Sequence, residues 1–282
     1  MDRLRDYNPF RRREEYSPTA LLAARVLSTC SWLVSVVVSV YYGTKNTGDA
    51  NRNDDVWAQN YAHPSSFTLN ATLGGVFWAS LLNWQVLYLA HLFSRDASRV
   101  HNAATVCGYF IANNVLHFAF TALLVNSCFG WAEGLLLLNF ASLTVLQFRR
   151  KDLPIQTHLP TVSFPLSWTF VALYWNGFMM IPNQSLVAAR VAGSIFIWGI
   201  LGYGLVCLLA LKDFALCLCL SFLAVAIGVG QMERLASVPE LISPFIIATV
   251  LAFGPLVWLK HKRLGIVSRN SESECDDKDS SA

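Results

Sequence analysis

The chain has 282 residues, of which 54% are hydrophobic and 14% are charged, and its mean hydropathy is +0.43. An ordinary soluble domain is about one quarter charged, so this composition excludes a typical soluble globular protein. The formal net charge of +3 is small and the basic residues are dispersed, so nucleic acid is not expected as a partner. The expected partner is the lipid bilayer.

Apolar runs long enough to cross a bilayer as helices recur along most of the chain. In chain order they cover residues 19–42, 73–93, 103–125, 128–148, 162–181, 187–211, 214–232 and 241–259. This pattern predicts an all-α fold, a polytopic transmembrane helical bundle of about eight spans. The fourth and seventh runs are short, and only Lys212 and Asp213 separate the sixth from the seventh. A seven-span or re-entrant version is therefore the alternative.

Basic residues between the runs set the expected orientation. With both termini in the cytosol, every inner connection carries Lys or Arg, and the outer side holds fewer of them. The first apolar run lacks a cleavage pattern, so it is expected to be an uncleaved anchor. The chain then divides into a basic N-terminus at 1–18, a transmembrane domain at 19–263 with an outer loop at 43–72, and an acidic tail at 264–282 that is expected to be disordered.

Polar side chains inside the predicted spans are the first candidates for function, because lipid offers them no hydrogen bonds. His117 lies in the middle of the third span and shares a helix face with Asn113. Such an imidazole either bonds a neighbouring helix or serves as a catalytic or ligand-binding group. Amides in spans are likewise either interhelical glue or ligand contacts. The candidate ligand-binding residues are Asn113, Asn114, Trp168, Trp175 and Asn176.

Six acidic side chains near the spans fall on the expected outer side, and several are expected to converge over one cavity mouth. They are Asp49, Asp54, Asp55, Glu133, Glu233 and Glu240. Glu133 follows Trp131 in an apolar stretch, where burial would keep its carboxyl protonated and able to act as a general acid. The alternative interpretation is a glutamate solvated in a short loop. Asp55 is the candidate acid of the long outer loop.

Three further patterns bear on function. Trp168, Trp175 and Phe178 recur at helical spacing, a stripe that is usually packing but that can also bind flat lipophilic molecules or stabilise cations. Asn70 and Asn183 begin glycosylation sequons on the expected outer side, each close to a span. The seven cysteines lack the spacing of a metal site, and neither a metal nor another cofactor is expected.

Two segments carry a family resemblance, NPFRRRE at 8–14 and VWAQNYAHPSSF at 56–67. With them the chain resembles, over most of its length, a fungal family of multi-pass membrane proteins of unknown function, and this resemblance implies no activity. The runs FIANNVLHFAF at 110–120 and FPLSWTFVALYWNG at 164–177 are similar to tryptophan-rich sensory proteins of the translocator-protein type. That similarity implies a helical bundle holding a porphyrin or a sterol, although this chain has extra spans.

Size, span number and aromatic content also resemble those of the small integral-membrane terpene cyclases of fungal secondary metabolism. In those enzymes an acid protonates an epoxide or alkene, and aromatic rings guide the carbocation. The chain shows no diagnostic motif of these cyclases, so the analogy is one of class.

Three functional hypotheses follow from these patterns. The favoured one is a membrane enzyme for an isoprenoid-type substrate, a proton-initiated terpene cyclase in which Glu133 or Asp55 donates the proton and His117 accepts the last one. The alternative is a translocator-like protein that binds or transports a lipophilic ligand, with Asn113, Asn114 and His117 fixing its polar group. A structural component, using the polar residues only as glue, is the third. The expected location is the endoplasmic reticulum or another endomembrane.

Overall fold

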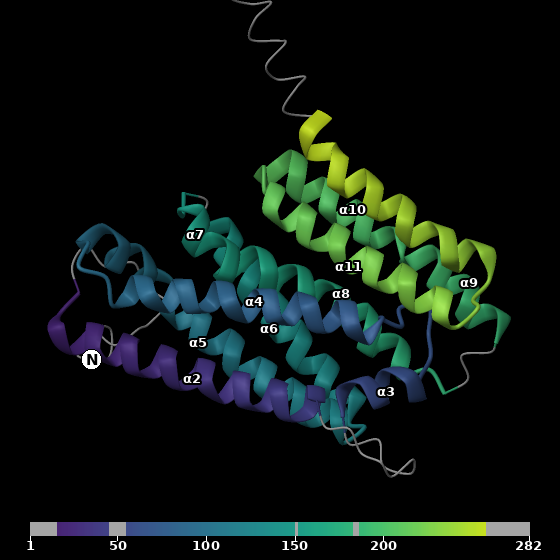
Figure 1. Ribbon diagram of the computed structural model, residues 1–282, viewed down its shortest axis with the longest axis horizontal. Helices are drawn as coiled ribbons and strands as arrows, with labels where there is room; N and C mark the ends of the chain where they lie inside the picture. The colour runs from purple at the N-terminus through teal and green to yellow at the C-terminus, as the bar shows by residue number, and fades with distance from the viewer. Residues whose placement is uncertain (1–15, 45–54, 150–151, 183–185, 258–282) are drawn as a thin grey trace, which may run out of the picture.

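The computed structural model describes residues 16–44, 55–149, 152–182 and 186–257, and within them all regular structure is helical (Figure 1). The helices are α2 (Pro18–Thr44), α3 (Val56–Ala62), α4 (Ala71–Leu92), α5 (Ala97–Val125), α6 (Phe129–Arg149), α7 (Ile155–His158), α8 (Phe164–Met179), α9 (Val187–Phe196), α10 (Trp198–Val206), α11 (Phe214–Glu233) and a last helix at Val238–Val257. Two π-helical turns, η1 (Leu159–Ser163) and η2 (Cys207–Leu211), interrupt the pattern. The predicted all-α helical bundle is confirmed.

Seven of the described helices are long and apolar enough to cross a membrane, which is typical of a multi-pass membrane protein. They are Pro18–Gly43, Ala71–Leu92, Cys107–Val125, Phe129–Arg149, Val187–Leu211, Phe214–Glu233 and Val238–Val257. The predicted span at 162–181 is not among them. The helices α7, η1 and α8 follow one another directly over residues 155–179, which is long enough to cross a membrane. The segment is less apolar than the seven, because it carries polar side chains such as Ser167, Thr169 and Asn176. The fourth and seventh predicted spans, named as the doubtful ones in the seven-span alternative, both meet the criterion.

Helix α8 lies at the centre of the bundle. It contacts α6 on one side and α11 on the other, and α5 in turn contacts both α2 and α6. Figure 1 shows the resulting arrangement, with α2, α4, α5 and α6 to one side of α8 and α9, α10, α11 and the last helix to the other. Trp175 and Val171 of α8 are fully buried. A central helix surrounded by protein does not need a uniformly apolar surface, which explains the polar residues of α8.

Polar side chains mark several helix starts. Asp55, Asn70, Asp96 and Asp213 each precede a helix and accept a hydrogen bond from a backbone N–H of its first turn. These caps satisfy donors that the helix itself leaves free. The predicted outer loop at 43–72 therefore contains a capped helix, α3, and ends at the cap of α4.

The segment 65–70 between α3 and α4 is buried against α11. Phe67 and Leu69 are fully enclosed, and the backbone N–H of Asn70 donates to the carbonyl of Ala226 at 2.9 Å. Gly230 permits this approach, because a Cβ at that position would lie 2.4 Å from the carbonyl oxygen of Thr68. The contact fixes α3 and the start of α4, which both contribute to the cavity described next.

Candidate functional site

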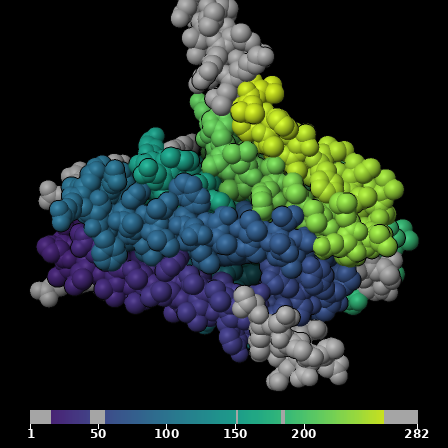
Figure 2. All heavy atoms as spheres, in the orientation of Figure 1, coloured from purple at the N-terminus to yellow at the C-terminus, as the bar shows by residue number. Residues whose placement is uncertain are grey.

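A cavity of about 260 Å³ lies among α2, α3, α4, α5 and α8. Figure 2 shows a hollow between α2, in purple, and α3 and α4, in blue. Its lining is mostly apolar and consists of Ser39, Val40, Gly43, Val56, Trp57, Gly75, Trp78, Ala79, Leu82, His117, Phe120, Thr121, Leu124, Trp168 and Trp175. Among these lining residues His117 is the one side chain that can ionise near neutral pH. The cavity therefore suits an apolar molecule with few polar groups.

Tryptophan side chains form much of the wall. The rings of Trp78 and Trp168 meet edge to face with centroids 4.9 Å apart, and Trp168 and Trp175 are 5.8 Å apart. The indole N–H of Trp175 donates to the side-chain oxygen of Asn60 at 2.8 Å, which ties α8 to α3. Asn60 is itself held by both backbone groups of Leu69. The wall is thus held in place by hydrogen bonds and ring packing before any ligand binds.

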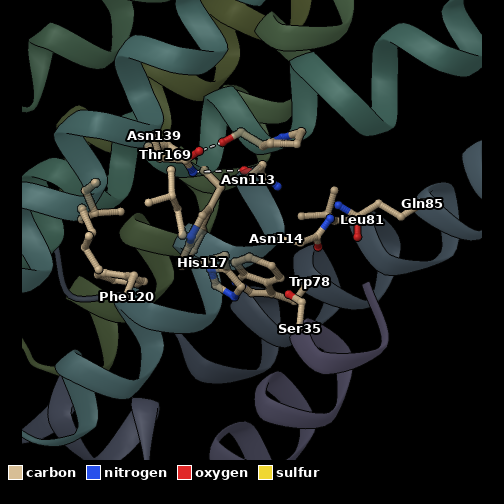
Figure 3. A pocket seen from close by; sticks show the side chains of 15 residues that line it. Ser35, Trp78, Leu81, Gln85, Asn113, Asn114, His117, Phe120, Asn139 and Thr169 are labelled. Carbon is tan, nitrogen blue, oxygen red and sulfur yellow. Dashed lines mark hydrogen bonds between the residues drawn. The ribbon is translucent and has the colours of Figure 1, made fainter. Parts of the chain in front are cut away.

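His117 lies against this wall (Figure 3). Its imidazole stacks on Trp78 with centroids 4.2 Å apart and an angle of 21° between the rings. Its Nε2 atom is 3.4 Å from the hydroxyl of Ser39 and 3.5 Å from that of Thr121. Both distances are long for a hydrogen bond, so the ring is positioned mainly by stacking. The imidazole and the two hydroxyls form a small polar group in an otherwise apolar cavity.

A second, much smaller cavity of about 10 Å³ adjoins the first, because Trp78, His117, Phe120 and Trp168 line both. It is about the size of one water molecule. Figure 3 shows its amides, where Asn139 donates to Asn113 at 3.0 Å and to the hydroxyl of Thr169 at 3.3 Å. Asn114 instead donates to the carbonyl of Phe110 on its own helix at 2.9 Å. These amides serve as interhelical and helical glue around the polar end of the site.

Three buried polar atoms around the two cavities lack a hydrogen-bond partner among the described residues. They are the indole nitrogen of Trp168 and the amide oxygens of Gln85 and Asn139. A buried polar atom without a partner costs about 1–3 kcal/mol, so such atoms are uncommon in a folded protein. All three side chains line the small cavity together with His117, which makes that cavity the place for a polar atom of a ligand or for a water molecule.

The structure brings together four predicted site residues, His117, Asn113, Asn114 and Trp168, around the small cavity, and Trp175 joins His117 and Trp168 in the larger one. Glu133 and Asn176, which were also predicted site residues, line neither of the two cavities.

Glu133 and Asn176 instead meet each other across the contact between α6 and α8. The amide nitrogen of Asn176 donates to the Glu133 carboxyl at 2.8 Å and to the carbonyl of Phe129 at 3.0 Å. Glu133 is therefore not a glutamate solvated in a short loop, which was the alternative prediction. Its side chain is half-buried and bonded to another helix.

The remaining outer acids each have their own partner and do not share one cavity mouth. Asp55 caps α3 by accepting from the backbone N–H of Ala58 at 2.6 Å. Glu233 accepts from Asn70, and Glu240 accepts from Ser66 and Ser237 and pairs with Arg190 at 3.4 Å. Asp49 and Asp54 lie outside the described residues. Neither of the two cavities described above is lined by Asp55, Glu133, Glu233 or Glu240, so the expected convergence is not seen there.

Of the two predicted glycosylation sites, the structure describes Asn70 but not Asn183. Asn70 is buried, its side-chain oxygen caps α4, and its amide nitrogen donates to Glu233 at 2.5 Å. A glycan on that nitrogen would disturb the contact with Glu233, whereas the cap uses the side-chain oxygen. Asn183 lies outside the described residues.

Sequence reasoning did not select Trp78, Ser39 or Thr121, which complete the surroundings of His117. Thr121 could have been found, because it lies four residues after His117 on the same helix face. Trp78 and Ser39 belong to other helices, and the sequence of one helix does not reveal which face of another it meets.

The comparison with known protein families finds a match over about the last third of the chain. A family model described as "Fungal protein of unknown function (DUF1774)" matches residues 190–281. No curated protein and no solved structure matches the chain. The two motifs that suggested a fungal family, at 8–14 and 56–67, lie outside the matched residues. The resemblance was expected over most of the chain, but the match covers residues 190–281 only. Over residues 190–281 the expected resemblance is confirmed, and the chain is similar there to a fungal family of unknown function.

Proposed function

We propose that the protein binds a lipophilic molecule with one polar end, such as a prenol, in the cavity beside His117. The observation that carries this proposal is the apolar, tryptophan-walled cavity whose ionisable lining, among the described residues, is His117 alone. An apolar chain would gain about 25 cal/mol per Å² removed from water. A terminal hydroxyl would reach the imidazole and the hydroxyls of Ser39 and Thr121.

A hydroxyl fits this group because it both donates and accepts hydrogen bonds. A neutral imidazole offers one donor and one acceptor, and a serine or threonine hydroxyl offers either. A charged ligand fits poorly, since no lining residue described here carries a compensating charge. The proposal is therefore binding or transport of a neutral lipid, in line with the translocator-like alternative.

The experiment compares two probes that differ by one hydroxyl, farnesol and farnesene. Radiolabelled farnesol is bound to the detergent-solubilised full chain and displaced by unlabelled farnesol or by farnesene. We expect farnesol to displace about ten-fold better, because one ordinary hydrogen bond is equivalent to about that factor. The variant His117→Phe should bring the two probes to nearly equal potency. Equal potency on the unchanged chain would contradict the proposal.

A second variant tests the cavity itself. Gly75 lines the cavity and has no atom within 4 Å of where a Cβ would lie, so Gly75→Leu would place its side chain in the open space. It should abolish farnesol binding. Gly202→Leu on α10 is the matched control, because its surroundings are equally open and it does not line the cavity. Loss of binding in both variants would point to a general effect on the bundle.

The cyclase hypothesis stays a prediction with its own test. It requires a proton donor near the substrate, and neither Glu133 nor Asp55 lines the cavity. If the chain cyclises epoxidised prenyl compounds when expressed in a fungal host, and Glu133→Gln abolishes the product without changing expression, the enzyme hypothesis replaces simple binding. The expected endomembrane location is tested by microscopy of a tagged full chain in the same host.

A further inference from the structure

A second group of polar residues lies towards the opposite end of α8, where α6 ends and α11 begins. At its centre is Asp213, whose side chain is only 4% exposed. It accepts hydrogen bonds from His158 Nε2 and Gln147 Nε2, both at 2.9 Å. Ser163 and the backbone N–H of Leu216 complete the set, at 3.2 and 2.9 Å. Both oxygens of the carboxylate thus accept hydrogen bonds from donors of the protein itself.

This arrangement keeps the carboxylate ionised. Burial alone would raise the pKa of Asp213, but the hydrogen bond and charge of His158, the N–H of Leu216 and the amide of Gln147 together lower it. An ionised carboxylate can only accept hydrogen bonds. His158 must therefore carry a hydrogen on Nε2, and Gln147 must present its NH₂ group to Asp213.

With His158 and Gln147 oriented towards Asp213 in this way, one polar atom of each side chain remains without a hydrogen-bond partner among the described residues. His158 Nδ1 and Gln147 Oε1 are buried and have no hydrogen-bond partner among the described residues. Both residues line a cavity of about 180 Å³, together with the exposed Lys212. A buried polar atom without a partner destabilises the fold, and a ligand that bonds both atoms would remove that cost.

The backbone around this cavity departs from regular helix at three places. The π-helical turn η1 ends at Ser163, the second turn η2 ends at Leu211, and Lys212 has a φ of 57°, in the left-handed region. Non-glycine residues seldom adopt that φ, and π-helical turns occur often at functional sites. Ser163, at the end of η1, donates to Asp213, and Lys212, which follows η2, directly precedes Asp213 in the chain.

The chemistry of the free atoms indicates the ligand. Gln147 Oε1 requires a hydrogen-bond donor. His158 Nδ1 accepts when the imidazole is neutral and donates when it is charged, and a hydroxyl satisfies either form. The ammonium of Lys212 disfavours a cationic ligand and favours a phosphate. Adjacent hydroxyls joined to a phosphate meet all three requirements.

We propose that this cavity is a second binding site, which takes a polyol phosphate, supplied either by a phospholipid headgroup or by a soluble sugar phosphate. The site is independent of the cavity beside His117, because the two linings share no residue.

The test is competition between two lipids of equal charge. The detergent-solubilised full chain is incubated with equal amounts of phosphatidylinositol and phosphatidylserine, and the bound lipids are counted by native mass spectrometry. Both lipids are anionic, but only the first presents adjacent hydroxyls. We expect about a ten-fold preference for phosphatidylinositol, equivalent to two hydrogen bonds of modest strength. Equal binding of the two lipids would overturn the proposal.

Three variants assign the effect to the site. His158→Gln keeps a donor for Asp213 but removes Nδ1, so the preference should fall to about two-fold or less. Lys212→Asn tolerates the left-handed backbone and removes the charge, so it should weaken both lipids and leave their ratio unchanged. His101→Gln, away from the cavity, is the control and should match the unchanged chain. If His158→Gln does not fold, Lys212→Asn still decides, because a site elsewhere would not respond to it.

A final arm separates the two sources of the ligand. myo-Inositol 1-phosphate is added to the chain loaded with phosphatidylinositol. Displacement at concentrations similar to those of the lipid would assign a soluble sugar phosphate, and no displacement would assign the lipid headgroup. Either result supports the polyol phosphate chemistry.

Discussion

His117 and His158 are both enclosed in the helical bundle, but the atoms around them differ in kind. His117 stacks on Trp78 and has only two hydroxyls nearby, at 3.4 and 3.5 Å. His158 bonds at 2.9 Å to a buried carboxylate, Asp213, that several other donors also hold. One imidazole is therefore positioned by ring packing and the other by a charged hydrogen bond.

The difference follows from where each site lies relative to the ends of helices. Asp213 is tolerated because it precedes α11, where the N–H of Leu216 and the helix dipole favour a negative charge. His117 lies in the middle of α5, away from any helix start, and there the cavity lining is neutral. The helix start at Asp213 thus supports the charged network of His158, whereas His117 has no such helix end beside it.

The largest effect is expected for Asp213→Ala. The substitution leaves the donors of His158, Gln147 and Leu216 buried without an acceptor, so it should lower the free energy of unfolding by about 3–5 kcal/mol. Asp96→Ala is the matched control, since Asp96 also caps a helix but is exposed, and it should cost about 1 kcal/mol. Unfolding in mixed detergent micelles measures both. Similar costs for the two variants would reduce Asp213 to an ordinary helix cap.

The pH dependence of the same contribution follows from the lowered pKa of Asp213. A carboxyl with a lower pKa in the folded than in the unfolded chain stabilises fully above the unfolded value, about 3.9, and loses this contribution as the pH falls through the folded value. The stability difference between the unchanged chain and Asp213→Asn should therefore stay constant from about pH 7 to pH 5 and shrink below about pH 4. A difference that already closes between pH 7 and pH 5 would mean that Asp213 is not the titrating group.

Gly230→Ala should lower the free energy of unfolding by less than Asp213→Ala does, and it should also weaken ligand binding in the cavity beside His117. The new methyl group would collide with the carbonyl of Thr68 and displace segment 65–70, at a cost of about 1–3 kcal/mol. Because Asn60 bonds both Leu69 and Trp175, farnesol binding should weaken while phosphatidylinositol binding does not. Gly202→Ala, in open space, should be neutral or slightly stabilising. Equal effects on both ligands would show that the two sites are coupled.

The smallest effect on stability is expected for His117→Phe. Phenylalanine keeps the stacking on Trp78 and removes only long contacts to Ser39 and Thr121, so the free energy of unfolding should change by less than about 1 kcal/mol. Thermal unfolding with and without farnesol separates stability from binding. A cost of about 3 kcal/mol or more would make His117 a structural residue rather than a ligand contact.

Much of the fold could be predicted from the sequence because hydropathy is a local property. Seven of the eight predicted spans coincide with helices of spanning length, and the connection at Lys212 and Asp213 lies where expected. The predicted span at 162–181 lies in a continuous helical segment that is long enough but less apolar than the seven, because it carries polar side chains such as Ser167, Thr169 and Asn176. The sequence alone does not show that these polar side chains are buried against other helices.

The sequence by itself determined which residues are unusual: a histidine in mid-span, an amide series around it and aromatic residues at helical spacing. Only the tertiary structure decided their partners. It placed Trp78 on His117, joined Glu133 to Asn176 away from the cavity, and brought His158 to Asp213 across 55 residues. The physical reason is that local periodicity fixes the faces of each helix, whereas the packing of side chains between helices fixes which faces meet.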